Sequence, residues 1–283
     1  MSRRILVFVP GILGTEIKDR DGVVWPPQMG DVLRQDKLLD RITSAKGHGN
    51  PIRSAYCRDV YEPIWRTLSA IDATDDDLLF LPMGFDWRLD IIDAAHRLAE
   101  DIGRAVRGSD KRNLQIVIVA HSMGGLVVRT ILEQNLRPSW VKYVRAAIFV
   151  GTPHSGAPRA AAAALGLVAV QGIRAATLRR YVESGRFQSF LGLMPPGDCP
   201  IIQNWDGRRF DSSDTSVAIC RELGIDPKKA LKHWNLLRSQ GFSKPDDCHY
   251  FCIGNGNVQT IAALSRQSAG WRILERLRAT RWR

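Results

Sequence analysis

Short apolar runs of strand length, separated by segments of helical periodicity, restrict the fold of this chain more than any other feature. The clearest run is LQIVIVA at 114–120, and similar runs occupy 4–9, 78–82, 145–151 and 249–253. The runs are apolar throughout rather than alternating, which is typical of parallel strands that helices cover on both faces. We therefore predict an α/β protein with a mostly parallel central sheet.

The segments between these runs differ in their residue patterns. Residues 60–71 and 90–106 have apolar side chains at helical spacing, and a helix that begins at Gly124 must end before Pro138. Residues 16–57 contain WPP, KGHGNP and scattered charges, and we interpret them as a long irregular excursion.

A change of composition suggests where the domains divide. From Pro158 the chain becomes rich in Ala and Arg and has helical spacing, until strand-like residues return after Asp247. We predict an α/β core at 1–157, an inserted helical cap at 158–247, and a return strand with a basic tail at 248–283.

The composition is that of a globular protein and argues against a nucleic-acid-binding protein. The 283 residues are 45% hydrophobic and 24% charged, as in a soluble globular protein, and the net charge is +11. Five arginines lie in the last twelve residues, yet no nucleic-acid fold signature accompanies them, so we expect no nucleic-acid partner. The positive charge would suit peripheral contact with a membrane surface.

Targeting and metal-binding signals are absent from the sequence. The apolar run before Pro10 is too short for a signal peptide or a membrane span, and no later run reaches that length, so we expect a cytoplasmic location. The five cysteines have no spacing typical of zinc. We predict no metal and no cofactor, and the sequence does not indicate an oligomeric state.

A serine between small residues ends the clearest strand. Ala120, His121, Ser122, Met123 and Gly124 form a small-x-Ser-x-Gly pattern with a strand before it and a helix after it. This is the signature of a nucleophile elbow, in which small side chains allow a tight turn that raises the serine hydroxyl above the sheet. The alternative is a serine that caps the helix and has no chemical role.

A nucleophilic serine needs backbone N–H groups that stabilise the oxyanion. One would be the N–H of Met123, at the start of the helix. The second should come from a loop after a neighbouring strand, and the segment VPGILGTE turns at Pro10-Gly11, so Ile12 is the candidate donor. The alternative is an ordinary turn after a strand.

The segments FVPGILGT, PMGFDWRLD, VAHSMGGLV and FVGTPHSGAP together resemble the lecithin:cholesterol acyltransferase-like family. This family belongs to the α/β-hydrolase superfamily and includes phospholipid acyltransferases and lysosomal-type phospholipases. The resemblance covers most of residues 4–260. It implies an α/β-hydrolase fold with helices on both faces of the sheet and an inserted helical cap.

The resemblance also implies a chemistry. Ser122 would be the nucleophile, with the amides of Ile12 and Met123 as oxyanion hole. Structural or site-lining roles would fall to Asp86, Trp87 and Arg88. The implied activity is serine-dependent hydrolysis or O-acyl transfer on a lipid or other acyl ester, through an acyl-enzyme. No motif shows whether water or an acceptor alcohol takes the acyl group.

The catalytic partners that the resemblance implies are missing from the sequence. The family carries its acid in a Gly-Asp-Gly-Thr-Val-type turn after the strand that resembles 249–253, and its histidine near the C-terminus. Here no histidine follows His249, and the only acidic residue after Asp247 is Glu275. Weak substitutes lie in the predicted cap or at a strand start: Asp206, Asp211, Asp214, His233 and His249.

The missing partners leave open whether the chain is an enzyme. We expect a hydrolase fold that is incomplete at its C-terminus, and a poor catalyst or none. A truncated or frame-shifted product and a degenerate paralogue are both compatible with the sequence. The alternative function is a catalytically inactive hydrolase-like protein that binds a lipid or a protein partner.

Overall fold

The computed structural model describes residues 4–32, 34–55, 58–109, 111–134, 137–196, 202–203, 215–239, 242–254, 259–267 and 270–278. The chain divides into two compact units. The first comprises Met1–Trp87, Ile91–Thr152 and Ser239–Ile253, and the second comprises Arg88–Asp90, Pro153–Arg238 and Gly254–Arg283.

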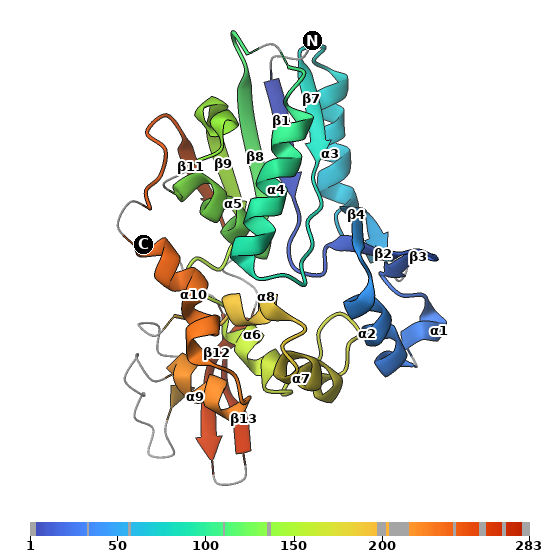
Figure 1. Ribbon diagram of the computed structural model, residues 1–283, viewed down its shortest axis with the longest axis vertical. Helices are drawn as coiled ribbons and strands as arrows, with labels where there is room; N and C mark the ends of the chain where they lie inside the picture. Colours follow the sequence, from blue (N-terminus) through green and yellow to red (C-terminus); the bar gives the residue numbers. More distant parts are fainter. Residues whose placement is uncertain are drawn as a thin grey trace. The chain divides into compact units, whose positions relative to one another are not determined.

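The first unit is built on a parallel sheet (Figure 1). Among the described residues its strands are β1 (Arg4–Val9), β7 (Leu78–Pro82), β8 (Gln115–His121), β9 (Val144–Val150) and β11 (His249–Ile253). They lie in the order β11-β9-β8-β1-β7, and every neighbouring pair is parallel. The predicted parallel sheet and its strands are therefore confirmed.

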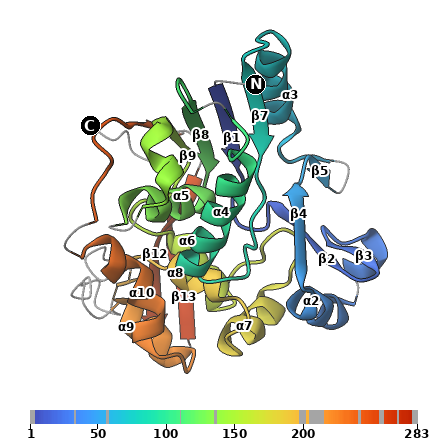
Figure 2. The same ribbon diagram turned by 45° about the horizontal axis from the view of Figure 1, so that its top comes forward.

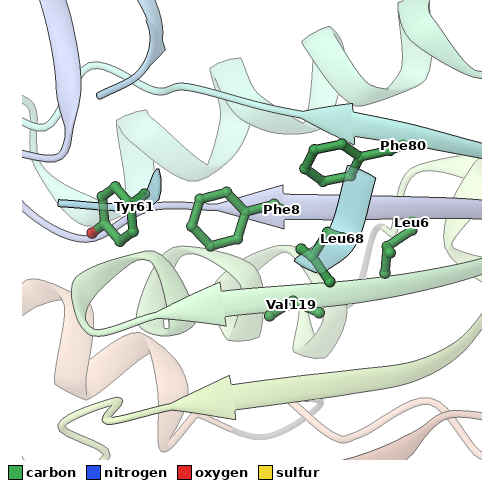
Figure 3. Packing of buried hydrophobic residues seen from close by; sticks show 6 residues of the cluster. All are labelled: Leu6, Phe8, Tyr61, Leu68, Phe80 and Val119. Carbon is green, nitrogen blue, oxygen red and sulfur yellow. The ribbon is translucent and has the colours of Figure 1, made fainter. Parts of the chain in front are cut away.

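Helices cover both faces of this sheet. One face packs against α3 (Glu62–Ala73) through the buried cluster in Figure 3, which consists of Leu6, Phe8, Tyr61, Leu68, Phe80 and Val119. Successive residues of a strand point to opposite faces, so Val9 points away from the face of Phe8. Val9 lies close to Gly124, which places α5 (Met123–Glu133) on that opposite face. There α4 (Ile91–Ala105) packs beside α5. A short 3₁₀ helix, η1 (Ser139–Tyr143), leads into β9.

The stretch 16–57 is not irregular, so that expectation was wrong. A small antiparallel sheet has the order β3-β2-β4, with β2 (Thr15–Asp19), β3 (Gly22–Trp25) and β4 (Gly47–Pro51). The other elements are α1 (Met29–Val32), α2 (Gln35–Ser44), β5 (Ser54–Ala55) and β6 (Arg58–Asp59). The strand β4 reads GHGNP, and its pairing depends on its partner strand rather than on an apolar pattern of its own.

The second unit combines helices with another small sheet (Figure 2). Its helices are α6 (Pro158–Ala164), α7 (Ala175–Glu183), α8 (Gln188–Gly192), α9 (Thr215–Glu222) and α10 (Pro227–Leu237). The sheet has the order β10-β12-β13, with β10 (Ile202–Gln203), β12 (Gln259–Gln267) and β13 (Gly270–Arg278), and α6 packs against β12. The arginine-rich segment thus contains a strand that the sequence analysis did not predict. The placement of a cap over Ser122 and the domain boundaries remain predictions.

Within the described ranges, no helix is both long enough and apolar enough to cross a membrane.

Candidate active site

Several loops of the first unit emerge at one edge of the parallel sheet. Ser122 follows the carboxyl end of β8, Gly11 lies just beyond β1, and Asp86 comes shortly after β7. The strands are parallel and in register, so these loops share the edge where α/β proteins usually bind ligands.

Ser122 has an unusual backbone conformation at this edge. Its φ is 51° and its ψ is −125°, a combination that residues with a side chain rarely adopt. The N–H of Ser122 donates to the carbonyl oxygen of Val150 at 2.9 Å, and its own carbonyl accepts from the N–H of Gly125 at 3.0 Å. The strained turn is thus held between the end of β9 and the first turn of α5.

The side chain of Ser122 does not cap the helix. It makes no capping hydrogen bond to the N–H groups of α5. The structure therefore does not support the alternative that this serine serves only as an N-cap. Its hydroxyl is held at the sheet edge without a hydrogen-bond partner among the described residues.

Two glycines let the start of α5 approach its surroundings closely. A methyl group at Gly124 would overlap the carbonyl oxygen of Pro10, and one at Gly125 would overlap the hydroxyl of Thr152. The atoms nearest to a Cβ at position 124 belong to Val9 and Pro10. Ala120 itself is buried in β8.

The loop after β1 forms a tight turn. The carbonyl of Gly11 accepts a hydrogen bond from the N–H of Gly14 at 3.1 Å, and Leu13 has a φ of 60°. In a trans peptide the C=O and N–H groups point in opposite directions. The N–H of Ile12 therefore points away from Gly14, and it finds no acceptor in the described part of the chain.

The N–H of Met123 is the other proposed oxyanion donor. Met123 is the first residue of α5, where N–H groups have no acceptor within the helix. The helix dipole adds partial positive charge at this end. Both proposed donors thus come from backbone positions that have no acceptor among the described residues.

The turn at Gly11 lies directly against the serine. A Cβ at Gly11 would be 2.9 Å from the Cβ of Ser122 and 3.1 Å from Nδ1 of His121. Only glycine allows this approach, because real Cβ atoms essentially never come closer than 3.0 Å to other atoms. The loop that carries Ile12 and the turn that carries Ser122 are therefore in contact.

Tyr61 joins this group, although no motif in the sequence points to it. Its hydroxyl oxygen accepts a hydrogen bond from the N–H of Gly11 at 2.8 Å and lies 2.8 Å from Nδ1 of His121. Burial raises the pKa of Tyr61 to about 12 and lowers the pKa of His121. Tyr61 begins an apolar helical pattern, so its sequence context indicates only a core aromatic residue.

The Asp-Trp-Arg segment after β7 is buried. The exposed fractions are 5% for Asp86, 0% for Trp87 and 9% for Arg88. The indole N–H of Trp87 donates to the carbonyl of Thr15 at 2.9 Å, which fixes this loop to β2. Trp87 thus has a structural role, and lining of the site by Asp86 and Arg88 remains a prediction.

None of the candidate substitutes for the catalytic acid and base is placed beside Ser122 in the described part of the first unit. His249 pairs with Ala146 at the amino end of the sheet, about 13 Å along the strands from Val150, whose carbonyl holds Ser122. His233 is fully buried in the second unit, and Asp206, Asp211 and Asp214 lie outside the described residues. Over the described ranges, no cluster of three or more His, Cys, Asp or Glu could hold a metal.

Comparisons with known proteins agree with this architecture. The family model described as lecithin:cholesterol acyltransferase matches residues 58–236. No curated protein sequence matches the chain.

Solved structures are similar at low identity. The crystal structure of the Tle4–Tli4 complex is 12% identical, with 94% of this chain and 77% of that chain covered and a TM-score of 0.59. Phospholipase PlaB from Legionella pneumophila is 13% identical, with 90% and 39% covered and a TM-score of 0.41. Siderophore hydrolase EstB from Aspergillus fumigatus is 12% identical, with 91% and 72% covered and a TM-score of 0.39. The fold of the chain is that of the α/β-hydrolases.

Proposed function

Because the chain belongs to the lecithin:cholesterol acyltransferase family, we propose that it is a serine-dependent hydrolase or O-acyltransferase of lipid-like esters, with Ser122 as the nucleophile. The observation that carries this proposal is the conformation of Ser122, strained between β8 and α5 with its side chain free of the helix cap. Strain of this kind costs about 1–3 kcal/mol and persists where function requires it.

The first chemical step is attack of Ser122 on an ester. Its Oγ bonds to the carbonyl carbon, and the carbonyl oxygen becomes an oxyanion. The N–H groups of Ile12 and Met123 are proposed to stabilise that charge, and each such donor contributes about 10²–10³ to kcat. Collapse of the intermediate breaks the bond to the leaving oxygen, and this alkoxide takes up the proton that Ser122 released, so that a free alcohol departs.

The second step releases the acyl group from Ser122. Attack by water gives a free acid, and attack by an acceptor alcohol gives a new ester. Access of water to the acyl-enzyme decides between the two outcomes. The predicted helical cap at 158–247 would limit that access and supply an apolar surface for the acyl chain.

The rate depends on a group that takes the serine proton. No hydrogen bond to Ser122 Oγ exists among the described residues, and Nδ1 of the adjacent His121 is already bonded to Tyr61. Loss of a triad member typically costs about 10⁴- to 10⁶-fold in kcat, with the remainder due to the oxyanion hole and binding. We therefore propose slow turnover.

The test is covalent labelling with a fluorophosphonate probe, together with hydrolysis of a short-chain p-nitrophenyl ester. We expect labelling at Ser122, located by mass spectrometry of the peptide, and slow hydrolysis above background. Both signals should vanish in Ser122→Ala. Labelling that persists in the variant would refute Ser122 as the nucleophile, and fast turnover would reveal a base within this chain.

The second candidate is a hydrolase-like protein that binds a lipid or a protein partner without turnover. Two observations favour it: within the described part of the chain Ser122 Oγ has no hydrogen-bond partner, and His249 lies at the amino end of the sheet. Equal, near-background rates for the chain and for Ser122→Ala would support this function. Binding of the ester substrate should then be measurable by calorimetry without release of product.

A further inference from the structure

A single buried hydroxyl connects two parts of the candidate active site. Tyr61 is 7% exposed, and its Oη lies 2.8 Å from both the N–H nitrogen of Gly11 and Nδ1 of His121. Gly11 belongs to the turn that carries Ile12, and His121 immediately precedes Ser122. Figure 3 shows the hydroxyl on the side of the Tyr61 ring that faces away from Phe8, beyond the arrowhead of β1.

The two hydrogen bonds assign the protons. A backbone N–H can only donate, so the Tyr61 oxygen accepts from Gly11. The phenol then has one hydrogen to donate, and Nδ1 of His121 is the acceptor within reach. A neutral His121 that accepts at Nδ1 carries its proton on Nε2. The geometry thus selects one tautomer of this histidine.

Hydrogen bonds to Arg53 hold the backbone of Tyr61 in place. The carbonyl of Arg53 accepts from the N–H of Tyr61 at 3.0 Å and also from the neighbouring N–H groups of Val60 and Glu62. The guanidinium of Arg53 in turn binds both carboxylate oxygens of Glu62, at 2.6 and 2.8 Å. The start of α3 is therefore anchored where Tyr61 reaches toward the site.

The Tyr61 ring is held by packing as well. It meets the ring of Phe8 edge to face with centroids 5.2 Å apart, and the ring of His121 with centroids 5.5 Å apart. Gly14 leaves room for it, since a Cβ there would lie 2.8 Å from Cε2 of Tyr61. Rigid support of this kind is what a precise active site requires.

We propose that Tyr61 is a positioning residue of the Ser122 site, which holds the Gly11 turn and the His121 ring at fixed places beside the serine. This proposal rests on the proposed function of Ser122. The hydroxyl orients the peptide before Gly11, and the bond from Gly14 to the Gly11 carbonyl orients the peptide after it. The Ile12 N–H belongs to that second peptide, so its direction depends on both.

The first test is the rate of Ser122 labelling by the fluorophosphonate probe. Tyr61→Phe keeps the ring and removes the hydroxyl, and we expect the second-order rate constant to fall about tenfold to hundredfold. The matched control is Tyr143→Phe, which removes a hydroxyl in the same unit and should label at the wild-type rate. Thermal unfolding curves must show that both variants are folded at the labelling temperature.

The second test reads the proton position directly and requires no activity. In ¹⁵N-histidine-labelled protein, the signal of His121 is identified by its loss in His121→Gln. We expect the wild-type ring to carry its proton on Nε2 alone, and Tyr61→Phe to show a mixture of tautomers. A loss of packing alone would not produce that change.

The outcomes separate this proposal from the proposed function. Wild-type labelling that depends on Ser122 but is unchanged in Tyr61→Phe would overturn the positioning role and leave the nucleophile in place. A wild-type His121 protonated on Nδ1 would also overturn it. Absence of Ser122-dependent labelling in the wild-type chain would overturn the proposed function, and the positioning role with it.

Discussion

The carbonyl oxygen of Pro10 lies so close to Gly124 that a methyl group on Gly124 would overlap it. The first turn of α5 and the end of β1 therefore approach each other only because position 124 lacks a side chain. We expect Gly124→Ala to lower the free energy of unfolding by about 1–3 kcal/mol, because the helix must shift away from β1. Urea unfolding measures this change.

The control for that prediction is Gly108→Ala. No atom lies within 4 Å of a Cβ built at Gly108, and its φ is outside the left-handed region. This variant should be neutral or stabilising by about 0.4–1 kcal/mol, since alanine has fewer unfolded conformations. Equal losses in the two variants would contradict the close contact with Pro10.

Ser122 should itself be a source of instability. Its φ of 51° with ψ of −125° is a conformation that glycine adopts without strain. We expect Ser122→Gly to be more stable than Ser122→Ala by about 1 kcal/mol, because relief of strain exceeds the greater flexibility of glycine in the unfolded chain. Chemical denaturation of both variants under the same conditions decides this, and equal stabilities would argue against strain.

The buried His121 should make stability depend on pH. Burial lowers its pKa in the folded chain, so below the ordinary histidine value of about 6.5 the unfolded chain binds more protons at this ring than the folded chain. Its contribution is present above that pH and is lost as the pH falls further. We expect His121→Gln to have a shallower decrease of stability between about pH 7.5 and 5. Identical slopes would contradict a buried neutral ring.

Glu62 should also make stability depend on pH, here because the folded chain favours the charged form of the side chain. Hydrogen bonds from Arg53 and Arg66 lower its pKa to about 2, from an ordinary value of 4.5. The stabilisation is therefore present above the ordinary pKa and disappears as the pH falls toward the lowered value. Glu62→Gln should lower the melting temperature at pH 7.

The comparison over pH tests the assignment to Glu62. The difference in melting temperature between the wild type and Glu62→Gln should shrink as the pH approaches 2. The control is Glu100→Gln, whose side chain is 74% exposed on α4 and whose removal should have little effect. A difference that stays constant with pH would show that the carboxylate charge of Glu62 is not responsible.

The parallel sheet could be predicted because its strands are buried on both faces. Runs such as ILVFV within β1 and IVIVA within β8 must be apolar throughout when helices cover them, and that pattern is visible in the sequence. The position of Ser122 followed from the same logic, since a strand that ends on small residues before a helix leaves little choice of turn.

Other elements left no such pattern. The strands of the small β3-β2-β4 sheet are short and partly exposed, and their pairing is decided by neighbours distant in sequence. The strand β13 was hidden because its many arginines suggested a solvated tail. The role of Tyr61 depends on contacts 50 and 60 residues away, at Gly11 and His121, and no local spacing could indicate them.

The contacts of the Tyr61 ring also restrict how this part of the sequence can vary. A Cβ at Gly14 would overlap the Tyr61 ring and would also lie 2.9 Å from the carbonyl oxygen of Gly11. A smaller residue at 61 would relieve only the first overlap, and it would give up the hydroxyl that Gly11 and His121 share. No single compensating change restores both the space and the hydrogen bonds. The four positions Gly11, Gly14, Tyr61 and His121 should therefore vary together or not at all, although they are spread over residues 11 to 121. In a library randomised at one of these positions at a time, selection for labelling should return the present residue at each.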